Sequence, residues 1–216
     1  MKNIKASCAI LLACFAAQAN ASIITLQTAY STAGSQSSAT AYKEVVERAL
    51  LSQGAGYGTK TVSSYDNLSN ANQFSGGSNS NIAWKATIDF SVANAATWTF
   101  RTGVDFGYGG ALFLDGVALT SRSTDMYWGN SYSSTTQYLQ ASSLLAAGNH
   151  TLTIYGLEGC CDGVQQAQFK AAGASFATFA ANDGIGPKAV PEPATLATFG
   201  LGLALVAGLR RRGKRG

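Results

Sequence analysis

Two adjacent cysteines, Cys160 and Cys161, are the residues whose types and spacing raise the first chemical question. A zinc or iron–sulfur centre needs more ligands than two neighbouring thiols and the single distant histidine, His150, can supply. A catalytic thiolate needs an activating base, and the surrounding sequence offers none. A disulfide remains, and it requires that the chain reach an oxidising compartment.

A bond between neighbouring cysteines is geometrically demanding. Adjacent Cα atoms lie ~3.8 Å apart across a trans peptide, whereas disulfides usually join Cα atoms ~4.4–6.8 Å apart. The tight turn that such a ring forces is tolerated by Gly159 on one side and by Asp162-Gly163 on the other. The sequence favours a bond between Cys160 and Cys161, with a bridge between two chains as the alternative.

Carboxylates beside the cysteines suggest a second chemistry. Glu158 and Asp162 have the residue types of a glycosidase acid pair. Two acids in one loop are nevertheless common without catalysis, and the sequence holds no Gly-x-Ser-x-Gly motif and only one histidine. The glycines from Gly107 to Gly110 lack the lysine and following helix of a phosphate-binding loop. We therefore expect a protein that is not an enzyme, with a glycan hydrolase as the least favoured alternative.

Both ends of the chain carry features of export. Residues 1–21 combine basic Lys2 and Lys5, an apolar run, and Ala19-Asn20-Ala21 as a small-x-small cleavage site. This order is that of a secretory signal peptide, which signal peptidase removes after Ala21. Because Cys8 and Cys14 lie in this segment, only the adjacent cysteine pair remains in the exported chain.

The C-terminal segment, residues 190–216, has three parts: Pro191-Glu192-Pro193, an uncharged apolar stretch at 194–209, and a cluster of arginines and a lysine. As a helix the stretch would span about 24 Å, slightly less than a bilayer core of about 30 Å. Its basic end would stay in the cytoplasm. These properties alone fit a permanent anchor and a temporary one equally.

The three-part tail resembles the PEP-CTERM sorting signal, and the Cys-Cys-x-Gly motif resembles the set of PEP-CTERM proteins named for it. This resemblance implies a Gram-negative bacterium that makes exopolysaccharide, and an exosortase that removes the tail. The implied route is transient anchoring in the inner membrane, followed by release to the cell surface or extracellular matrix.

Composition excludes nucleic acid as a partner. The net charge of the whole chain is +4, but the segment between the two terminal signals carries eight lysines and arginines against ten aspartates and glutamates. A slightly acidic body has no basic patch to attract phosphates. Its length suits one domain over residues 22–180, and residues 181–189 are expected to link this domain to the sorting signal.

The elements that must position these residues are mainly strands. Apolar residues at helical spacing predict one amphipathic helix near the N-terminus, from about Ala39 to Leu51, capped by Ser38. Elsewhere alternation predicts strands, and Asp115-Gly116 marks a hairpin. The fold class is therefore an antiparallel β-sandwich of the lectin-like jelly-roll kind. The strands are expected at 22–29, 82–92, 96–103, 111–119, 138–145, 149–157 and within 164–179.

The middle of the chain resembles the GLEYA and protective-antigen-like adhesin domains. The similar stretches are Trp98–Gly103, Leu112–Gly116 and Leu145–Tyr155, with Asp105 in the position of an acidic loop. In adhesive members, two adjacent aspartates of that loop hold a calcium ion that contacts sugar hydroxyls. Here Val104 precedes Asp105 and Phe106 follows it, so the pair is incomplete. Calcium at Asp105 is expected only with help from backbone oxygens, and otherwise Asp105 is a turn residue.

The resemblance and the sorting signal together predict glycan binding, with exopolysaccharide as the ligand. The loops around 105–110 and 160–163 are expected to form one end of the sandwich. Aromatic rings in loops can stack on sugars or simply pack at the edge of the sandwich. The alternative function is a structural or self-associating biofilm-matrix protein without a specific glycan. The predicted contact residues are Asp105, Tyr108, Gly109, Trp128 and Asp162.

Overall fold

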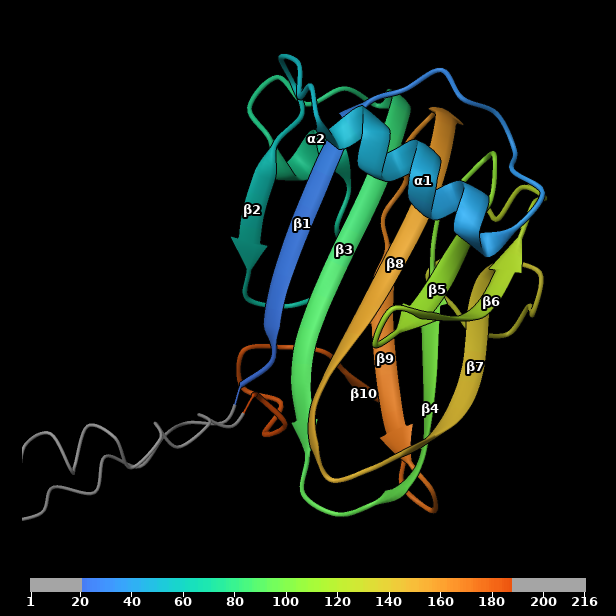
Figure 1. The fold of residues 1–216 in the computed structure, drawn as a ribbon. Coiled ribbons are helices and arrows are strands. Elements are labelled where there is room, and N and C mark those ends of the chain that lie inside the picture. Colours follow the sequence, from blue (N-terminus) through green and yellow to red (C-terminus); the bar gives the residue numbers. More distant parts are fainter. Residues whose placement is uncertain (1–20, 188–216) are drawn as a thin grey trace, which may run out of the picture.

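Ten strands and two helices form within residues 21–187, the part of the chain that this computed structural model describes. The strands make two antiparallel sheets that pack face to face (Figure 1), as predicted for a β-sandwich. The six-stranded sheet has the order β2 (Thr59–Val62), β1 (Ile23–Tyr30), β3 (Ser80–Val92), β8 (Gly148–Cys160), β5 (Gly110–Leu114), β6 (Val117–Arg122). The four-stranded sheet has the order β10 (Ala177–Thr178), β9 (Gln166–Ala171), β4 (Ala96–Gly103), β7 (Tyr138–Leu145).

The core lies between the sheets and follows the alternation seen in the sequence. Every second residue of β3 from Ile82 to Phe90 is fully buried. The ring of Phe100, on β4 of the other sheet, packs against the ring of Phe90. One chain of buried polar groups crosses the core: Trp84 Nε1 donates to the Tyr65 hydroxyl, which donates to Gln165 Oε1. The period of two along each strand thus accounts for which side chains fill the core.

The predicted helix is confirmed as α1 (Ala39–Leu50). The Ser38 side chain accepts a hydrogen bond from the backbone N–H of Ala41, as an N-cap should. The buried face of α1, which includes Tyr42 and Val46, lies on the outer surface of the six-stranded sheet (Figure 1). An ion pair between Lys85 and Glu47, 2.8 Å long, fastens the helix to β3.

The stretch at 67–81 is rich in asparagine, serine and glycine, a composition typical of a loop. It contains a short helix, α2 (Asn70–Gln73), capped by Ser69, and the first residues of β3. Strand β2 was also missed, because Thr59–Val62 lies at a sheet edge and is largely exposed, so it lacks a buried face to create a pattern. The Asp115-Gly116 hairpin is present, with both residues in the left-handed region at φ of 49° and 79°.

Strands β3 and β8 run the whole length of the sandwich and define its two ends. Ser80 pairs with Cys160 at one end, here called the loop end, and Val92 pairs with Gly148 at the other, here called the terminal end. At about 3.3 Å per residue the two ends are roughly 40 Å apart. The start of β1 and the segment after β10 lie together away from the loop end (Figure 1).

Residues 181–187 lie against the sandwich, because Ile185 packs on the core and its carbonyl accepts a bond from the Ser91 N–H. Within residues 21–187, no helix is long and apolar enough to cross a membrane. The predicted signal peptide, the Pro191-Glu192-Pro193 motif and the predicted helix at 194–209 fall outside the described residues.

Candidate functional site

The loop end brings together the two loops that the sequence singled out. The N–H of Gly163 donates to Asp105 Oδ2 at 2.6 Å, which ties the cysteine loop to the predicted acidic loop. The N–H of Tyr108 donates to the Leu157 carbonyl and the N–H of Leu157 to the Gly109 carbonyl, both at 3.0 Å. Residues 105–110 and 157–163 therefore form one connected surface.

Cys160 and Cys161 are bonded to each other, across a cis peptide. The predicted bond within the pair is confirmed, and both residues are exposed at the tip of β8. The ring of Tyr108 lies directly over Gly159, so closely that any side chain at position 159 would overlap it. An exposed tyrosine and an exposed disulfide thus stand side by side on the loop end.

Glu158 supports this surface from beneath. The side chain is 2% exposed, and its two oxygens accept hydrogen bonds from the backbone N–H groups of Gly107 and Cys160. Burial raises the pKa of Glu158 to about 7; the two N–H groups oppose the shift and the charge of Asp105 adds to it. The carboxyl group fixes the spacing between the glycine-rich loop and the disulfide.

Asp162 performs the same task toward the α2 segment. Its Oδ2 accepts a hydrogen bond from the Asn70 N–H, while its own N–H donates to the Asn79 carbonyl at 2.8 Å. Burial raises the pKa of Asp162 to about 7, against the Asn70 bond and with help from the charges of Asp105 and Glu158. We define Asp105, Glu158 and Asp162 as the acidic cluster. Its carboxylates accept backbone N–H groups from the α2 segment, the glycine-rich loop and the cysteine loop.

Asn70 is a site residue that sequence reasoning missed. Its side chain is fully buried and makes three hydrogen bonds, accepting from Thr28 and donating to the carbonyls of Gly56 and Ser78. The available signal was Ser69 three residues before Asn72, which has the spacing of a capping box. That signal is weak within a run of serines, asparagines and glycines.

Most carboxylate oxygens of the acidic cluster are already occupied by backbone donors. A calcium ion needs six to eight oxygen ligands, but one oxygen of Asp105 and both oxygens of Glu158 already accept backbone N–H groups. Residues 21–187 contain no group of three or more histidines, cysteines, aspartates or glutamates arranged to hold a metal ion. Asp105 ties the two loops together in this structure, and calcium at Asp105 stays a prediction.

Two other predicted contact residues are also covered. Trp128 is 5% exposed, and its ring fills the space over Gly103, where any side chain would overlap it. Gly109 is buried with Arg122 and Ser123 of the neighbouring chain segment against it. Their burial leaves Tyr108, the half-buried Asp162 and the disulfide as the predicted residues that reach the surface.

A glycosidase arrangement is not favoured by this geometry. A general acid and a nucleophile must both face the substrate. Glu158 is enclosed, with both oxygens occupied by backbone donors, so its raised pKa reflects burial and not exposure to a bond to be cleaved.

The comparisons with known proteins agree with the sequence at the tail and with the fold of the body. The PEP-CTERM protein-sorting motif matches residues 189–212. Among curated proteins, no sequence matches this chain.

Solved structures with the same fold include PA14 domains. A PA14 sugar-binding domain from an RTX adhesin is 12% identical, with a TM-score of 0.52, over 77% of this chain and 99% of that domain. The PA14 domain of the antifreeze protein MpAFP is also 12% identical, with a TM-score of 0.52, over 84% of this chain and 100% of that domain. An anti-sigma factor domain-containing protein reaches 0.51 at 11% identity, over 79% of this chain and 49% of that protein. At such low identities the likeness establishes a shared fold, and function must be argued from the site.

Proposed function

We propose that this protein is an exported, non-enzymatic glycan-binding protein that associates with exopolysaccharide through its loop end. The observation that carries the proposal is the platform made by the exposed ring of Tyr108 and the adjoining Cys160–Cys161 disulfide. Export is supported by the PEP-CTERM motif at 189–212. A PA14 domain of the same fold is described as sugar-binding.

The platform suits a sugar because it offers an apolar surface edged by polar groups. Tyr108 is 39% exposed and Tyr127, in the neighbouring loop, is 67% exposed. Aromatic faces contact the C–H faces of pyranose rings, while carboxyl and backbone groups nearby can bond hydroxyls. Because Tyr108 rests on Gly159, its ring is held in place before a ligand arrives, which lowers the entropy lost on binding.

The backbone beneath the platform is also held. The Tyr42 hydroxyl of α1 donates to the Tyr108 carbonyl at 2.6 Å, and Glu158 fixes Gly107. The platform is therefore attached to the sheet, to the helix and to the acidic cluster at once. A rigid exposed aromatic is the kind of residue that dominates binding energy at an interface.

The test is a glycan array and a polysaccharide pull-down with the exported body, residues 22–188. We expect Tyr108→Ala to weaken retention about tenfold, the loss of one well-placed anchor side chain. Tyr108→Phe should retain binding, because it keeps the ring. Leu144→Ala is the matched control, since Leu144 is 75% exposed near the terminal end of the sandwich. Equal retention by wild type and Tyr108→Ala on every glycan would refute the proposal.

A further inference from the structure

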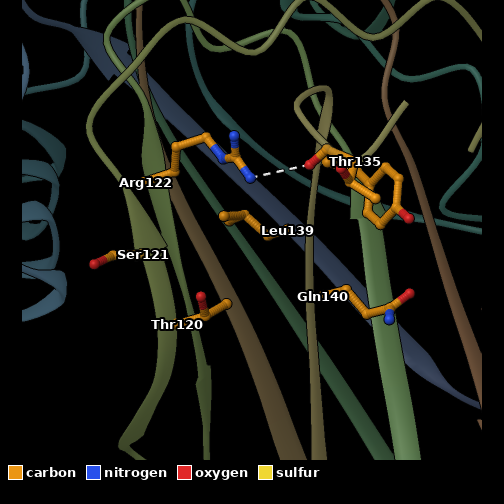
Figure 2. Close-up of a pocket in the computed structure, with 7 residues that line it drawn as sticks. Thr120, Ser121, Arg122, Thr135, Leu139 and Gln140 are labelled. Atoms are coloured by element: carbon orange, nitrogen blue, oxygen red, sulfur yellow. Dashed lines mark hydrogen bonds between the residues drawn. The ribbon is translucent and has the colours of Figure 1, made fainter.

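A polar groove lies at the open side of the sandwich, between the edge strands of the two sheets. Strand β6 ends the six-stranded sheet and β7 ends the four-stranded sheet. The groove between them has a volume of roughly 210 Å³, and Leu139, which is buried, forms part of its floor (Figure 2). Thr120, Thr135, Tyr138 and Gln140 also line it.

Arg122 is the charged group of this groove. Figure 2 shows its side chain reaching from β6 across to Thr135, whose carbonyl accepts a bond from Arg122 Nη2 at 2.9 Å. The ion pairs of residues 21–187 are Lys85 with Glu47 and His150 with Asp115, so Arg122 has no carboxylate within salt-bridge distance. A half-buried guanidinium with free N–H groups is suited to a carboxylate, which it binds through two parallel hydrogen bonds.

The groove adjoins the platform of the loop end. The carbonyl of Arg122 lies against Gly109, the residue after Tyr108. Gly110, the first residue of β5 after the platform loop, pairs with Arg122, the last residue of β6, so β6 ends beside that loop. A chain molecule that stacks on Tyr108 could therefore extend along β6 into the groove.

We propose that this groove binds a carboxylated sugar, a uronic acid residue of an anionic polysaccharide, with Arg122 as the group that recognises the carboxylate. Hydroxyl and amide side chains elsewhere in the groove supply the bonds that sugar hydroxyls need. Because the pKa values of Glu158 and Asp162 are raised to about 7, the acidic cluster is negatively charged above that pH and would then repel the same carboxylate from the platform. The inference rests on the proposed glycan binding and adds its charge preference.

The experiment compares binding of polygalacturonate and of neutral dextran by the body at low and high salt. Wild type should prefer polygalacturonate, and Arg122→Gln should weaken that binding about tenfold while leaving dextran unchanged. The wild-type affinity for polygalacturonate should fall with salt, and that of Arg122→Gln should not. Arg48→Gln, which removes an exposed cation from α1, is the matched control.

The outcomes separate this inference from the proposed function. Weaker binding of both polymers by Tyr108→Ala, with Arg122→Gln losing only the preference for polygalacturonate, supports both. Loss of polygalacturonate in Arg122→Gln with normal binding by Tyr108→Ala would overturn the platform and keep the groove. Equal affinities of wild type and Arg122→Gln for polygalacturonate would overturn the groove, as would inhibition by inorganic phosphate as strong as by free galacturonate.

A second inference concerns the terminal end and rests on a different observation. The backbone nitrogen of Ser22 donates to Asp183 Oδ1 at 3.2 Å, and Ser22 is 3% exposed. The same carboxylate accepts the N–H groups of Ile185 at 3.1 Å and Ala180 at 3.0 Å. Asp183 thus organises the segment that leads toward the sorting motif.

We infer that removal of the signal peptide after Ala21 creates an ammonium group at Ser22 that pairs with Asp183. The peptide nitrogen that now donates one hydrogen bond would become a charged donor with three hydrogens. Because Ser22 is buried, the bond before it is cut before the chain folds, and folding then encloses the new charge beside the carboxylate. Removal of the signal peptide would in this way strengthen the contact that holds the segment around Asp183, which precedes the C-terminal sorting signal, against the sandwich.

The test uses the body, residues 22–188, whose two sheets and shared core are complete. A chain that begins at Ser22 should melt at a higher temperature than one that retains Ala21, and Asp183→Asn should abolish the difference. The α-amine of Ser22 should also be acylated more slowly in the wild-type body than in Asp183→Asn, a readout that needs no unfolding. Equal melting temperatures of the two wild-type forms, or equal acylation rates, would overturn the inference.

Discussion

Glu158→Gln is the substitution that tests the acidic cluster most directly. An unfolded glutamate titrates near 4.5, whereas burial raises the pKa of Glu158 to about 7 in the folded protein. Between these values the folded chain holds the proton and the unfolded chain does not. The contribution of Glu158 to stability is therefore complete below pH 4.5, is lost as the pH rises to 7, and stays low above it.

The size of the effect follows from the shift. Each pKa unit corresponds to about 1.4 kcal/mol, so the shift sets a ceiling of about 3 kcal/mol. Water at the exposed rim of the loop end screens the charge, and we expect about 1–2 kcal/mol. Glutamine keeps one acceptor oxygen but turns an amide toward the second backbone donor, Gly107 or Cys160, which costs about 1–3 kcal/mol at all pH values.

The two effects can be separated by urea unfolding at pH 5 and pH 8. Glu158→Gln should be clearly less stable than wild type at pH 5, and the gap should narrow by about 1–2 kcal/mol at pH 8. Asp162 titrates in the same cluster and leaves a residual pH dependence in the variant. Glu44→Gln, an exposed carboxylate on α1, is the control and should show no such narrowing. A constant gap between wild type and Glu158→Gln from pH 5 to 8 would refute the argument.

Two further predictions concern packing and the terminal end. Gly156→Ala should lower the free energy of unfolding by about 1–3 kcal/mol, because the new methyl group overlaps the buried ring of Phe106. Gly129→Ala is the control and should change the free energy of unfolding little, because the nearest atom to its new methyl group lies 3.8 Å away. Urea unfolding curves measure both variants. Burial alone would lower the pKa of His150, but its 2.7 Å bond to Asp115 and its bond to a backbone carbonyl outweigh burial, so the pKa is raised above its usual 6.5. The stability that protonated His150 contributes is therefore complete below pH 6.5 and is lost as the pH rises through the raised pKa. Asp115→Asn should lower the His150 pKa in an NMR titration, and an unchanged pKa would contradict this.

The strands were predictable because their side chains face two environments. From Trp84 to Phe90 of β3 fully buried positions alternate with partly buried ones, and the predicted strand at 82–92 differs from Ser80–Val92 only at its start. Strands at 96–103 and 138–145 were predicted with the observed limits. Helix α1 was predictable for the same reason, since a capping serine and one apolar face are both local signals.

The site was only partly predictable, because its chemistry depends on contacts between distant segments. Asp105 lies 58 residues from Gly163, and the bond between them leaves no trace in local spacing. The sequence suggested a metal ligand where the structure has a backbone fastener. Trp128 was predicted at the surface because it lies in a loop, but Gly103 provides a space that its ring fills. Trp128 is therefore buried because Gly103 of β4 has no side chain, and the local sequence around position 128 does not reveal this.

The Tyr108 platform and the segment that precedes the sorting motif lie toward opposite ends of the sandwich. Pro187, the last described residue, is four residues before Pro191, so the sorting motif begins at most about 14 Å of extended chain away from the body. An enzyme that cuts there must work close to the terminal end, where the Ile185 carbonyl accepts a hydrogen bond from the Ser91 N–H of β3. The loop end lies roughly 40 Å away, at the far end of β3 and β8. The Tyr108 platform thus lies at the opposite end of the body from the segment that leads to the sorting motif.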